Sequence, residues 1–173
     1  MIVRRATNLD VDGVVRVIHA VFDEYGFTWE EDGYHADLYD LEASYDAIGD
    51  RFYVAELDGA ILGTAALEIF PPNPGAAGAI VQVETYRRVS GTDCSVERLY
   101  VHPDGRRRGV GQALLAHVIG EARALGFGNM EIWSDKRFTD AHRLYQRFGA
   151  VVAGDRILDD PDESPEWGLY IPL

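Results

Sequence analysis

Residues 97–112 of the chain read ERLYVHPDGRRRGVGQ. An apolar strand that ends near Val101 runs into a basic turn, and the pattern predicts that a helix opens directly from Gly109. This order would bring three arginines and several backbone N–H groups to the positive end of a helix dipole. The stretch therefore predicts a binding site for a phosphorylated ligand.

Strands and helices are expected to alternate on both sides of this turn. A strand over residues 1–6 precedes a helix that Asn8 is expected to cap. Strands over 51–56 and 60–70 flank Asp58-Gly59, a dipeptide typical of a hairpin turn. This alternation favours a mixed, three-layer α/β fold. The later elements are expected as strands over 94–101, 129–134, 150–157 and 167–171, and as helices over 109–125 and after a cap at Thr139.

Two segments are less regular. Residues 25–45 are rich in aromatic and acidic side chains, and glycines interrupt the parts that look helical. Residues 71–91 open on prolines that break the preceding strand, and residues 80–88 within them could add a strand. The sequence does not decide between two uses for this second segment. It could form a dimer contact, which would make the protein a homodimer, or it could form a lid.

Composition narrows the class of protein. The 173 residues suit a single domain over 1–173, and the net charge of −13 disfavours nucleic acid or an anionic membrane as a partner. Cys94 is the only cysteine, so neither an intramolecular disulfide nor a metal site with paired thiolates is expected. No signal-peptide pattern and no apolar run near the roughly 20 residues of a membrane helix is present, so a cytoplasmic location is expected.

Three motif families place glycines between a strand and a helix. A Walker loop needs Gly-Lys-Ser/Thr, but Gln112 follows the last glycine here. A dinucleotide fingerprint needs a third glycine where Leu114 stands. The pattern Arg/Gln-x-x-Gly-x-Gly/Ala is matched in full by residues 106–111.

With that hexapeptide and the later Ala141-x-x-Leu144-Tyr145-x-x-x-Gly149, most of the chain resembles the GNAT superfamily of acyl-CoA-dependent N-acyltransferases. The resemblance implies a single-domain α/β (α+β) fold, in which helices flank a mixed, mostly antiparallel sheet. It also implies a bulge and a splayed strand pair that binds CoA, with acetyl-CoA as co-substrate and no metal. The residues implied to bind CoA are Leu99, Tyr100, Val101, Arg106, Arg107, Arg108, Gly109, Val110, Gly111 and Gln112.

The same resemblance suggests how the reaction is catalysed. Tyr145 matches the family's acid, which protonates the leaving thiolate, although at this spacing it could also fill the apolar face of its helix. Glu97 is the candidate base, with an ion pair to a nearby arginine as the alternative. The backbone N–H of Leu99 is the candidate oxyanion donor. Phe138 stands where many members have an asparagine that contacts pantetheine, so Ser134 and Asp135 are the candidates to replace that contact.

An amine acceptor would meet the segment at 25–45 and an acidic loop at 159–166. Trp29, Tyr34 and His35 are the predicted acceptor-binding residues, and a cationic small molecule would suit aromatic faces among carboxylates. A merely solvated acidic rim is the alternative. His35 is also the preferred proton shuttle, whereas His142 is expected on the solvated side of its helix. Two other functions stay open: a protein or peptide N-acetyltransferase, and a non-catalytic acyl-CoA-binding module.

Overall fold

The computed structural model describes residues 1–173 and divides into two units. Strand β6 (Cys94–Val101) and helix α3 (Val110–Ala124) each contribute residues to both units. The first unit comprises Met1–Glu68 and Arg98–Val118, and the second comprises Ile69–Glu97 and Ile119–Leu173. Each unit contains its own part of the sheet and its own helices.

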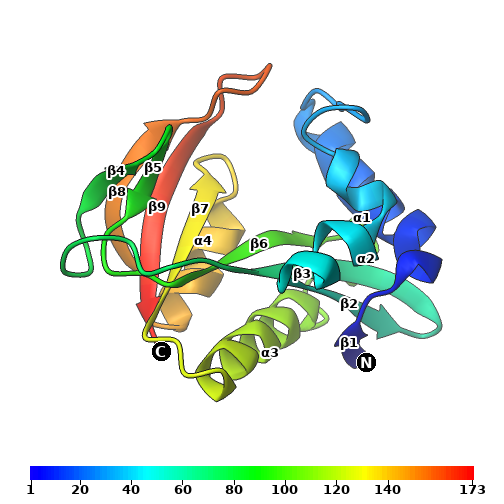
Figure 1. Ribbon diagram of the computed structural model, residues 1–173. Helices are drawn as coiled ribbons and strands as arrows, with labels where there is room; N and C mark the ends of the chain where they lie inside the picture. Colours follow the sequence, from blue (N-terminus) through cyan, green and yellow to red (C-terminus); the bar gives the residue numbers. More distant parts are fainter. The chain divides into compact units, whose positions relative to one another are not determined.

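The first unit contains strands in the order β1-β2-β3-β6 (Figure 1). Strands β1 and β2, like β2 and β3, pair antiparallel. Asp58 and Gly59 link β2 to β3 with φ angles of 54° and 79°, as a tight hairpin turn with two left-handed residues requires, so the predicted hairpin is confirmed. The bounds are Ile2–Arg5 for β1, Arg51–Leu57 for β2 and Ala60–Ile69 for β3.

Helices cover both faces of this part of the sheet. Val14, Ile18 and Phe22 of α1 (Val11–Tyr25) share one buried core with Phe52 and Val54 of β2. The intervening side chain, Tyr53, packs against His117 of α3, with the two ring centroids 4.7 Å apart. Alternation along β2 therefore directs successive side chains to opposite helices.

The start of α1 differs from the expectation. Thr7 rather than Asn8 is the capping residue: its side chain accepts from Leu9 N–H, and Asp10 completes a capping box around a short 3₁₀ turn at Asn8–Asp10. The Asn8 side chain instead donates to Asp40 at 2.9 Å. The segment after α1 then forms short helical turns, η2 (Ala36–Tyr39), α2 (Leu41–Ser44) and η3 (Asp46–Ile48).

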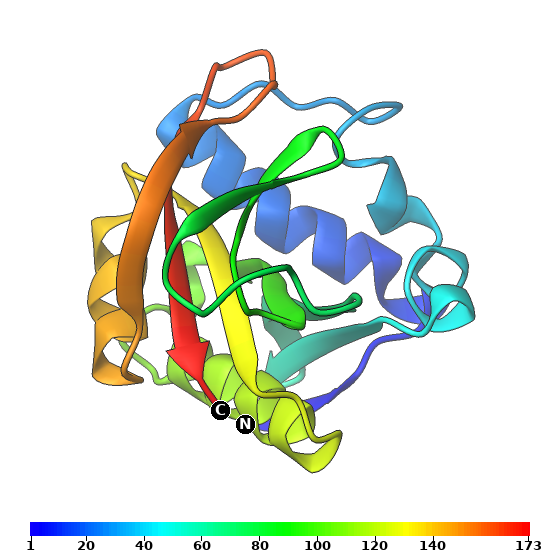
Figure 2. The ribbon, with the colours of Figure 1, turned by 60° about the vertical axis from the view of Figure 1, so that its left-hand side comes forward.

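The second unit contains strands in the order β6-β7-β9-β8, and Figure 2 shows β7, β9 and β8 side by side. The β6–β7 register is parallel and pairs Cys94 with Met130 and Ser95 with Glu131. The β7–β9 and β9–β8 pairs are antiparallel. The bounds are Asn129–Asp135 for β7, Val151–Ile157 for β8, Pro165–Pro172 for β9, and Thr139–Arg147 for helix α4. Thr139 is the first helical residue of α4 and not its cap, which is Phe138.

The excursion after Pro71 forms a hairpin of two strands, β4 (Ile80–Val83) and β5 (Tyr86–Val89), instead of the single strand that the sequence suggested over 80–88. A left-handed residue at Glu84, with a φ of 51°, lies in its turn. Buried Glu131 of β7 holds the hairpin, because its carboxylate accepts from Val89 N–H at 2.7 Å and pairs with Arg88 at 2.8 Å. The excursion therefore packs on the sheet of the second unit.

The predicted α/β fold, with a mixed, mostly antiparallel sheet flanked by helices, is confirmed. The assignment of residues 1–173 to one domain stays a prediction. No helix in the structure combines the length and the apolar character that crossing a lipid bilayer would require.

Candidate active site

The basic turn and the start of α3 form the predicted anion site in the first unit. Arg107 and Gly109 both have left-handed backbones, with φ angles of 57° and 82°. A Cβ built on Gly109 would meet no atom within 4 Å, so the backbone angle, not crowding, favours glycine there. The bond from Ala113 N–H to Gly109 C=O, at 2.9 Å, lies at the start of α3. The N–H groups of Val110, Gly111 and Gln112 precede it, as the N-terminal N–H groups of a helix do, and suit an anion.

Two of the three arginine side chains are engaged with carboxylates of the same unit. Arg106 binds Glu24 through two contacts of 2.7 and 2.5 Å, and Arg108 binds Asp58 at 2.5 Å. The Arg106 guanidinium holds the pKa of Glu24 below its usual range. These pairs are partly exposed, so each contributes little and can exchange. The backbone of the turn is therefore the firmer part of the anion site.

Strand β6 is interrupted at Arg98, whose φ of 51° is left-handed. The Arg98 carbonyl accepts a hydrogen bond from the Thr64 hydroxyl at 2.7 Å. This irregularity agrees with the bulge that the resemblance implies in this strand. Leu99, Tyr100 and Val101 follow it and are half-buried. The Tyr100 ring packs against Phe22 with centroids 5.9 Å apart, so its side chain belongs to the core.

The Arg98 side chain was not anticipated as a structural element. Its guanidinium contacts both Asp37 carboxylate oxygens at 3.1 and 2.8 Å, and donates to the Tyr34 carbonyl at 2.6 Å. It also lies 4.2 Å from the centre of the Tyr34 ring. The Tyr45 hydroxyl donates to the same Asp37 carboxylate. This network fastens the 34–45 segment to the irregular part of β6.

The predicted acceptor residues form an aromatic cluster. The Trp29 and His35 rings stack with centroids 3.8 Å apart, and both contact Phe22. His35 has no exposed surface, and its Nδ1 accepts from Glu30 N–H at 3.1 Å. Tyr34 is exposed, and Trp29 is half-buried. Contact between His35 and an acceptor would therefore require the segment to open, whereas Tyr34 and Trp29 already present surface.

Buried His35 makes stability depend on pH. Burial, helped by the Arg98 charge, lowers the pKa of His35 to about 4. Its stabilisation is therefore complete above the unfolded pKa of about 6.5 and is lost as the pH falls toward 4. Between pH 7 and pH 5, the free energy of unfolding should fall by about 2 kcal/mol more in the wild type than in His35→Gln. Urea unfolding at both pH values measures this. Equal pH dependences for the wild type and His35→Gln would contradict the assignment.

Tyr145 lies in the second unit, on α4, with 4% of its surface exposed. The Ser134 hydroxyl of β7 is 3.2 Å from His142 Nε2 and lies close enough to Tyr145 to affect its ionisation. Burial raises the pKa of Tyr145, the Ser134 hydroxyl opposes that rise, and the negative charge of Glu97 adds to it. The expectation that His142 is solvated is wrong: it is half-buried, and burial lowers its pKa. Its place three residues before Tyr145 on a helix could have indicated this shared face.

Glu97 lies on β6 in the same unit. Its carboxylate accepts from the Ser95 hydroxyl at 2.6 Å and lies close enough to Tyr145 to affect its ionisation. The two catalytic candidates thus belong to the same unit and interact electrostatically. Of the two candidates for the pantetheine contact, Asp135 is engaged by Arg137 at 2.6 Å, and the Ser134 hydroxyl is 3.2 Å from His142 Nε2.

The acidic loop at 159–166 is only partly a solvated rim. Glu166 is buried against Arg156, with an N–O distance of 2.6 Å, and burial raises its pKa. Asp160 accepts from the Ser164 hydroxyl at 2.7 Å. Asp159 and Glu163 are exposed. Glu166 therefore belongs to the interior of the second unit and not to an acceptor surface.

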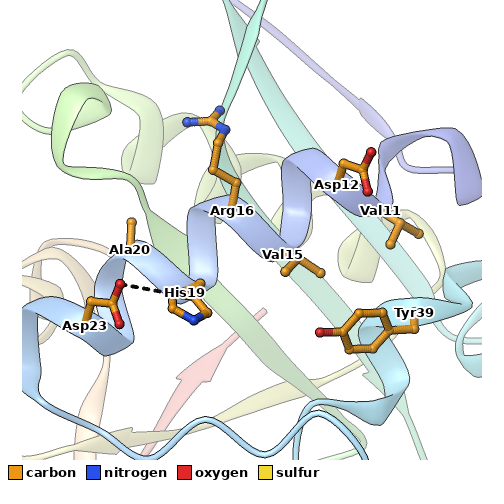
Figure 3. Close-up of a pocket in the computed structure, with 8 residues that line it drawn as sticks. All are labelled: Val11, Asp12, Val15, Arg16, His19, Ala20, Asp23 and Tyr39. Atoms are coloured by element: carbon orange, nitrogen blue, oxygen red, sulfur yellow. Dashed lines mark hydrogen bonds and ion pairs between the residues drawn. The ribbon is translucent and has the colours of Figure 1, made fainter.

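A hollow of about 450 Å³ runs along α1. Figure 3 shows Tyr39 nearest Val11 and Val15, and His19 in contact with Asp23. That contact measures 3.0 Å, and the Arg16 guanidinium donates to the Ile61 carbonyl at 2.5 Å. Among the polar groups of this hollow, His19 and Asp23 are thus paired with each other and Arg16 is bound to the backbone, and the sequence did not indicate the hollow.

Comparisons with known proteins agree with this geometry. A family model described as the acetyltransferase (GNAT) family matches residues 15–150, well over half of the chain. The uncharacterized N-acetyltransferase YjgM of Escherichia coli (strain K12) is 26% identical over 150 residues, which are 86% of this chain and 80% of that protein.

Solved structures share the fold. An acetyltransferase of the GNAT family from Staphylococcus aureus Mu50 is 17% identical with a TM-score of 0.74, over 99% of this chain and 98% of that one. The ribosomal-protein-alanine N-acetyltransferase of Brucella melitensis is 19% identical with a TM-score of 0.71, over 100% of both chains. The protein yncA from Salmonella typhimurium, solved with its cofactor acetyl-CoA, is 19% identical with a TM-score of 0.69, over 100% of this chain and 94% of that one.

Proposed function

The chain belongs to the acetyltransferase (GNAT) family and is an N-acetyltransferase that uses acetyl-CoA, and on that premise we propose that it acetylates a primary amine of a cationic small molecule by direct attack. The observation that carries the catalytic part of this proposal is that Glu97 of β6 and buried Tyr145 of α4 lie in the same unit, where the charge of Glu97 acts on the phenol. A direct transfer needs a base for the ammonium proton and an acid for the departing thiolate, and these two side chains supply that pair.

The turn after β6 would bind the diphosphate of the co-substrate. Support comes from the N–H groups at the start of α3 and from the open space beside Gly109, which lets an anion approach the backbone. Arg107 is exposed and would add charge. We assign the predicted pantetheine contacts to the backbone of Leu99 and Val101, and the oxyanion contact to Leu99 N–H.

Each catalytic side chain would then move one proton. Glu97 would accept a proton from the incoming ammonium through water, leaving a neutral amine to attack the thioester carbonyl. The tetrahedral oxyanion would be stabilised by backbone N–H. As the C–S bond breaks, the Tyr145 hydroxyl would protonate the thiolate, and the nitrogen, which is cationic after the attack, would lose its second proton to water. Tyr145 then regains a proton from water, so each turnover releases one proton to solvent. No covalent enzyme intermediate is required.

A cationic acceptor is supported by the net charge of −13 and by the exposed carboxylates Glu31 and Asp32 beside exposed Tyr34. A peptide acceptor is the second candidate, because the Brucella melitensis structure with the same fold is named for acetylation of a ribosomal-protein alanine. A cytoplasmic setting is part of the proposal and is supported by the single cysteine, Cys94.

The test is a free-thiol assay with acetyl-CoA and three acceptor sets: amines of rising positive charge, neutral amines, and peptides with free N-termini or lysines. The proposal expects kcat/KM to rise with the positive charge of small amines. Equal rates for neutral amines, or faster rates for peptides, would overturn the assignment of the acceptor. Acetyl-CoA binding without thiol release from any acceptor would instead indicate a non-catalytic module.

Glu97→Gln tests the base. Without the carboxylate, attack depends on the neutral amine already present in solution, and that fraction falls about tenfold for each pH unit below an amine pKa near 10. We expect a loss in kcat/KM of about tenfold at pH 6.5 that shrinks toward pH 9. The exposed Glu84→Gln variant, outside both segments expected to meet the acceptor, should match the wild type throughout. A pH–rate profile for Glu97→Gln that parallels the wild type would remove Glu97 from the base role.

A further inference from the structure

Arg98 is the one residue of the chain that has a left-handed backbone inside a strand. The other non-glycine residues with a positive φ lie in turns or loops: Asp58, Glu84, Arg107 and Glu163. A turn can itself impose such a conformation, whereas the regular ladder of a strand opposes it. The φ of 51° at Arg98 must therefore be held by contacts from neighbouring elements.

Two sets of contacts in the first unit hold Arg98. Its side chain binds Asp37 and the Tyr34 carbonyl. Its own carbonyl accepts a hydrogen bond of 2.7 Å from the hydroxyl of Thr64 on β3, the strand next to β6 in the sheet (Figure 1). Thr64 has no exposed surface, so this carbonyl is the partner that its buried hydroxyl needs. The carboxylate thus orients the arginine side chain, and the hydroxyl orients the peptide group.

The hydroxyl of Thr64 also determines where the next N–H group points. The Arg98 carbonyl and the Leu99 N–H are the two polar groups of one trans peptide unit. Such a unit is planar, and its C=O and N–H bonds point in opposite directions. Because the Arg98 carbonyl points to the Thr64 side chain, Leu99 N–H points away from β3. A hydroxyl on the neighbouring strand therefore sets the direction of a backbone donor that it does not touch.

Strand β3 also holds the other end of this short stretch. His102 N–H donates to the Leu62 carbonyl at 3.0 Å. The two backbones lie close together between these points, because a Cβ added to Gly63 would lie 3.3 Å from the Tyr100 carbonyl oxygen. Residues 99–101, to which the oxyanion and pantetheine contacts are assigned, are therefore held by β3 at both ends.

We propose that Thr64 is a positioning residue for acetyl transfer, because its hydroxyl directs Leu99 N–H toward the thioester oxygen. The proposal rests on the proposed function, which assigns the oxyanion contact to Leu99 N–H. A donor stabilises a developing oxyanion best when it is already oriented toward it, so rotation of this peptide unit would raise the barrier. Thr64 is itself buried and acts only through the peptide unit of Arg98 and Leu99.

The first test removes the hydroxyl of Thr64. Thr64→Val keeps the branched shape of the side chain, and we expect kcat to fall about tenfold because the peptide unit is no longer held. Thr64→Ala should give the same result without bringing a second methyl group toward the carbonyl. Thr64→Ser keeps the hydroxyl and should stay within about twofold of the wild type. Steady-state kinetics with acetyl-CoA and the best acceptor measure these values.

Thr92→Val is the matched control for the loss of a buried hydroxyl. Thr92, in the second unit, also has no exposed surface, and its hydroxyl donates to the Val89 carbonyl at the same distance of 2.7 Å. Urea unfolding should show that Thr92→Val and Thr64→Val both lose stability, whereas only Thr64→Val should lower kcat. The Kd of ADP, which has a diphosphate but no thioester, should be the same for the wild type and every variant.

The carbonyl stretch of bound acetyl-CoA reports on Leu99 N–H without any acceptor. Isotope-edited infrared spectroscopy should show a lower frequency for the thioester carbonyl in the wild-type complex than in solution, because a hydrogen bond weakens the C=O bond. This shift should become smaller in Thr64→Val and persist in Thr64→Ser and Thr92→Val. A hydroxyl that only stabilised the fold would leave the shift unchanged.

The outcomes separate this role of Thr64 from the proposed function. Wild-type kcat or an unchanged carbonyl shift in both Thr64→Val and Thr64→Ala would overturn the role of Thr64 and leave the oxyanion assignment standing. An equal loss of kcat in Thr92→Val would overturn it as well. If the wild-type complex shows no carbonyl shift, Leu99 N–H does not contact the thioester, and the oxyanion assignment fails together with the role of Thr64.

Discussion

Tyr145→Phe is expected to lower kcat by about 10²-fold while changing the Kd for acetyl-CoA less than twofold. The substitution keeps the ring that fills its buried place on α4, so the fold and the co-substrate contacts of other residues should persist. What is lost is the hydroxyl that would protonate the thiolate. The departing sulfur must then leave unprotonated, and the barrier for that step rises.

Steady-state kinetics with acetyl-CoA and the best acceptor measure kcat, and titration calorimetry without acceptor measures the Kd. The exposed Tyr86→Phe variant controls for the loss of a tyrosine hydroxyl elsewhere in the second unit and should match the wild type. A fall in affinity equal to the fall in kcat/KM, at constant kcat, would show that the hydroxyl serves binding and not proton transfer.

Asp37→Asn is expected to lower the free energy of unfolding by about 3 kcal/mol at pH 7. The Arg98 side chain is 11% exposed, and Asp37 is the carboxylate that contacts it through two oxygens. The asparagine keeps the shape but removes the negative charge, so the Arg98 cation is left without its partner in a poorly solvated place. Because Arg98 also has a left-handed φ, the same change should loosen the irregular part of β6.

Urea unfolding measures this difference, and Asp140→Asn is the matched control. Asp140 also pairs with an arginine, Arg143 at 2.6 Å, but its side chain is 88% exposed, so its loss should change stability by less than about 0.5 kcal/mol. Equal stabilities for the two variants would mean that the Arg98–Asp37 pair is no more important than a surface pair.

Local patterns predicted most elements of the fold. The expected strand at 94–101 agrees with β6. It was predictable because the turn and the glycines that follow the strand act on backbone only a few residues away. The cap was expected at Asn8, whereas Thr7 caps the short 3₁₀ turn that leads into α1; both are good capping residues, and only the return contact of Asp10 distinguishes them. The hairpin at 80–89 was missed because Glu84 takes the left-handed conformation that is usual for glycine or asparagine.

Longer-range contacts could not be predicted from one sequence. Arg98 and Asp37 are 61 residues apart, and nothing in either neighbourhood indicates that they meet. His35 was predicted as an acceptor-binding residue and proton shuttle, yet stacking on Trp29 and packing against Phe22 bury it completely. Tyr145 and Glu97 were found from the family pattern, but their mutual effect depends on how β6 and α4 pack within the second unit.

The ion pairs at the basic turn carry one more consequence. Glu24 and Asp58 act as internal competitors, because they already hold the guanidinium groups of Arg106 and Arg108. An incoming anion that binds these arginines must displace their carboxylates. Its net interaction energy is therefore the difference between its own attraction to the arginines and that of the carboxylates. A singly charged anion would merely exchange one carboxylate for another like it, whereas a diphosphate brings more charge to the same place. The proposed diphosphate site would thus favour a ligand of higher charge over monovalent anions.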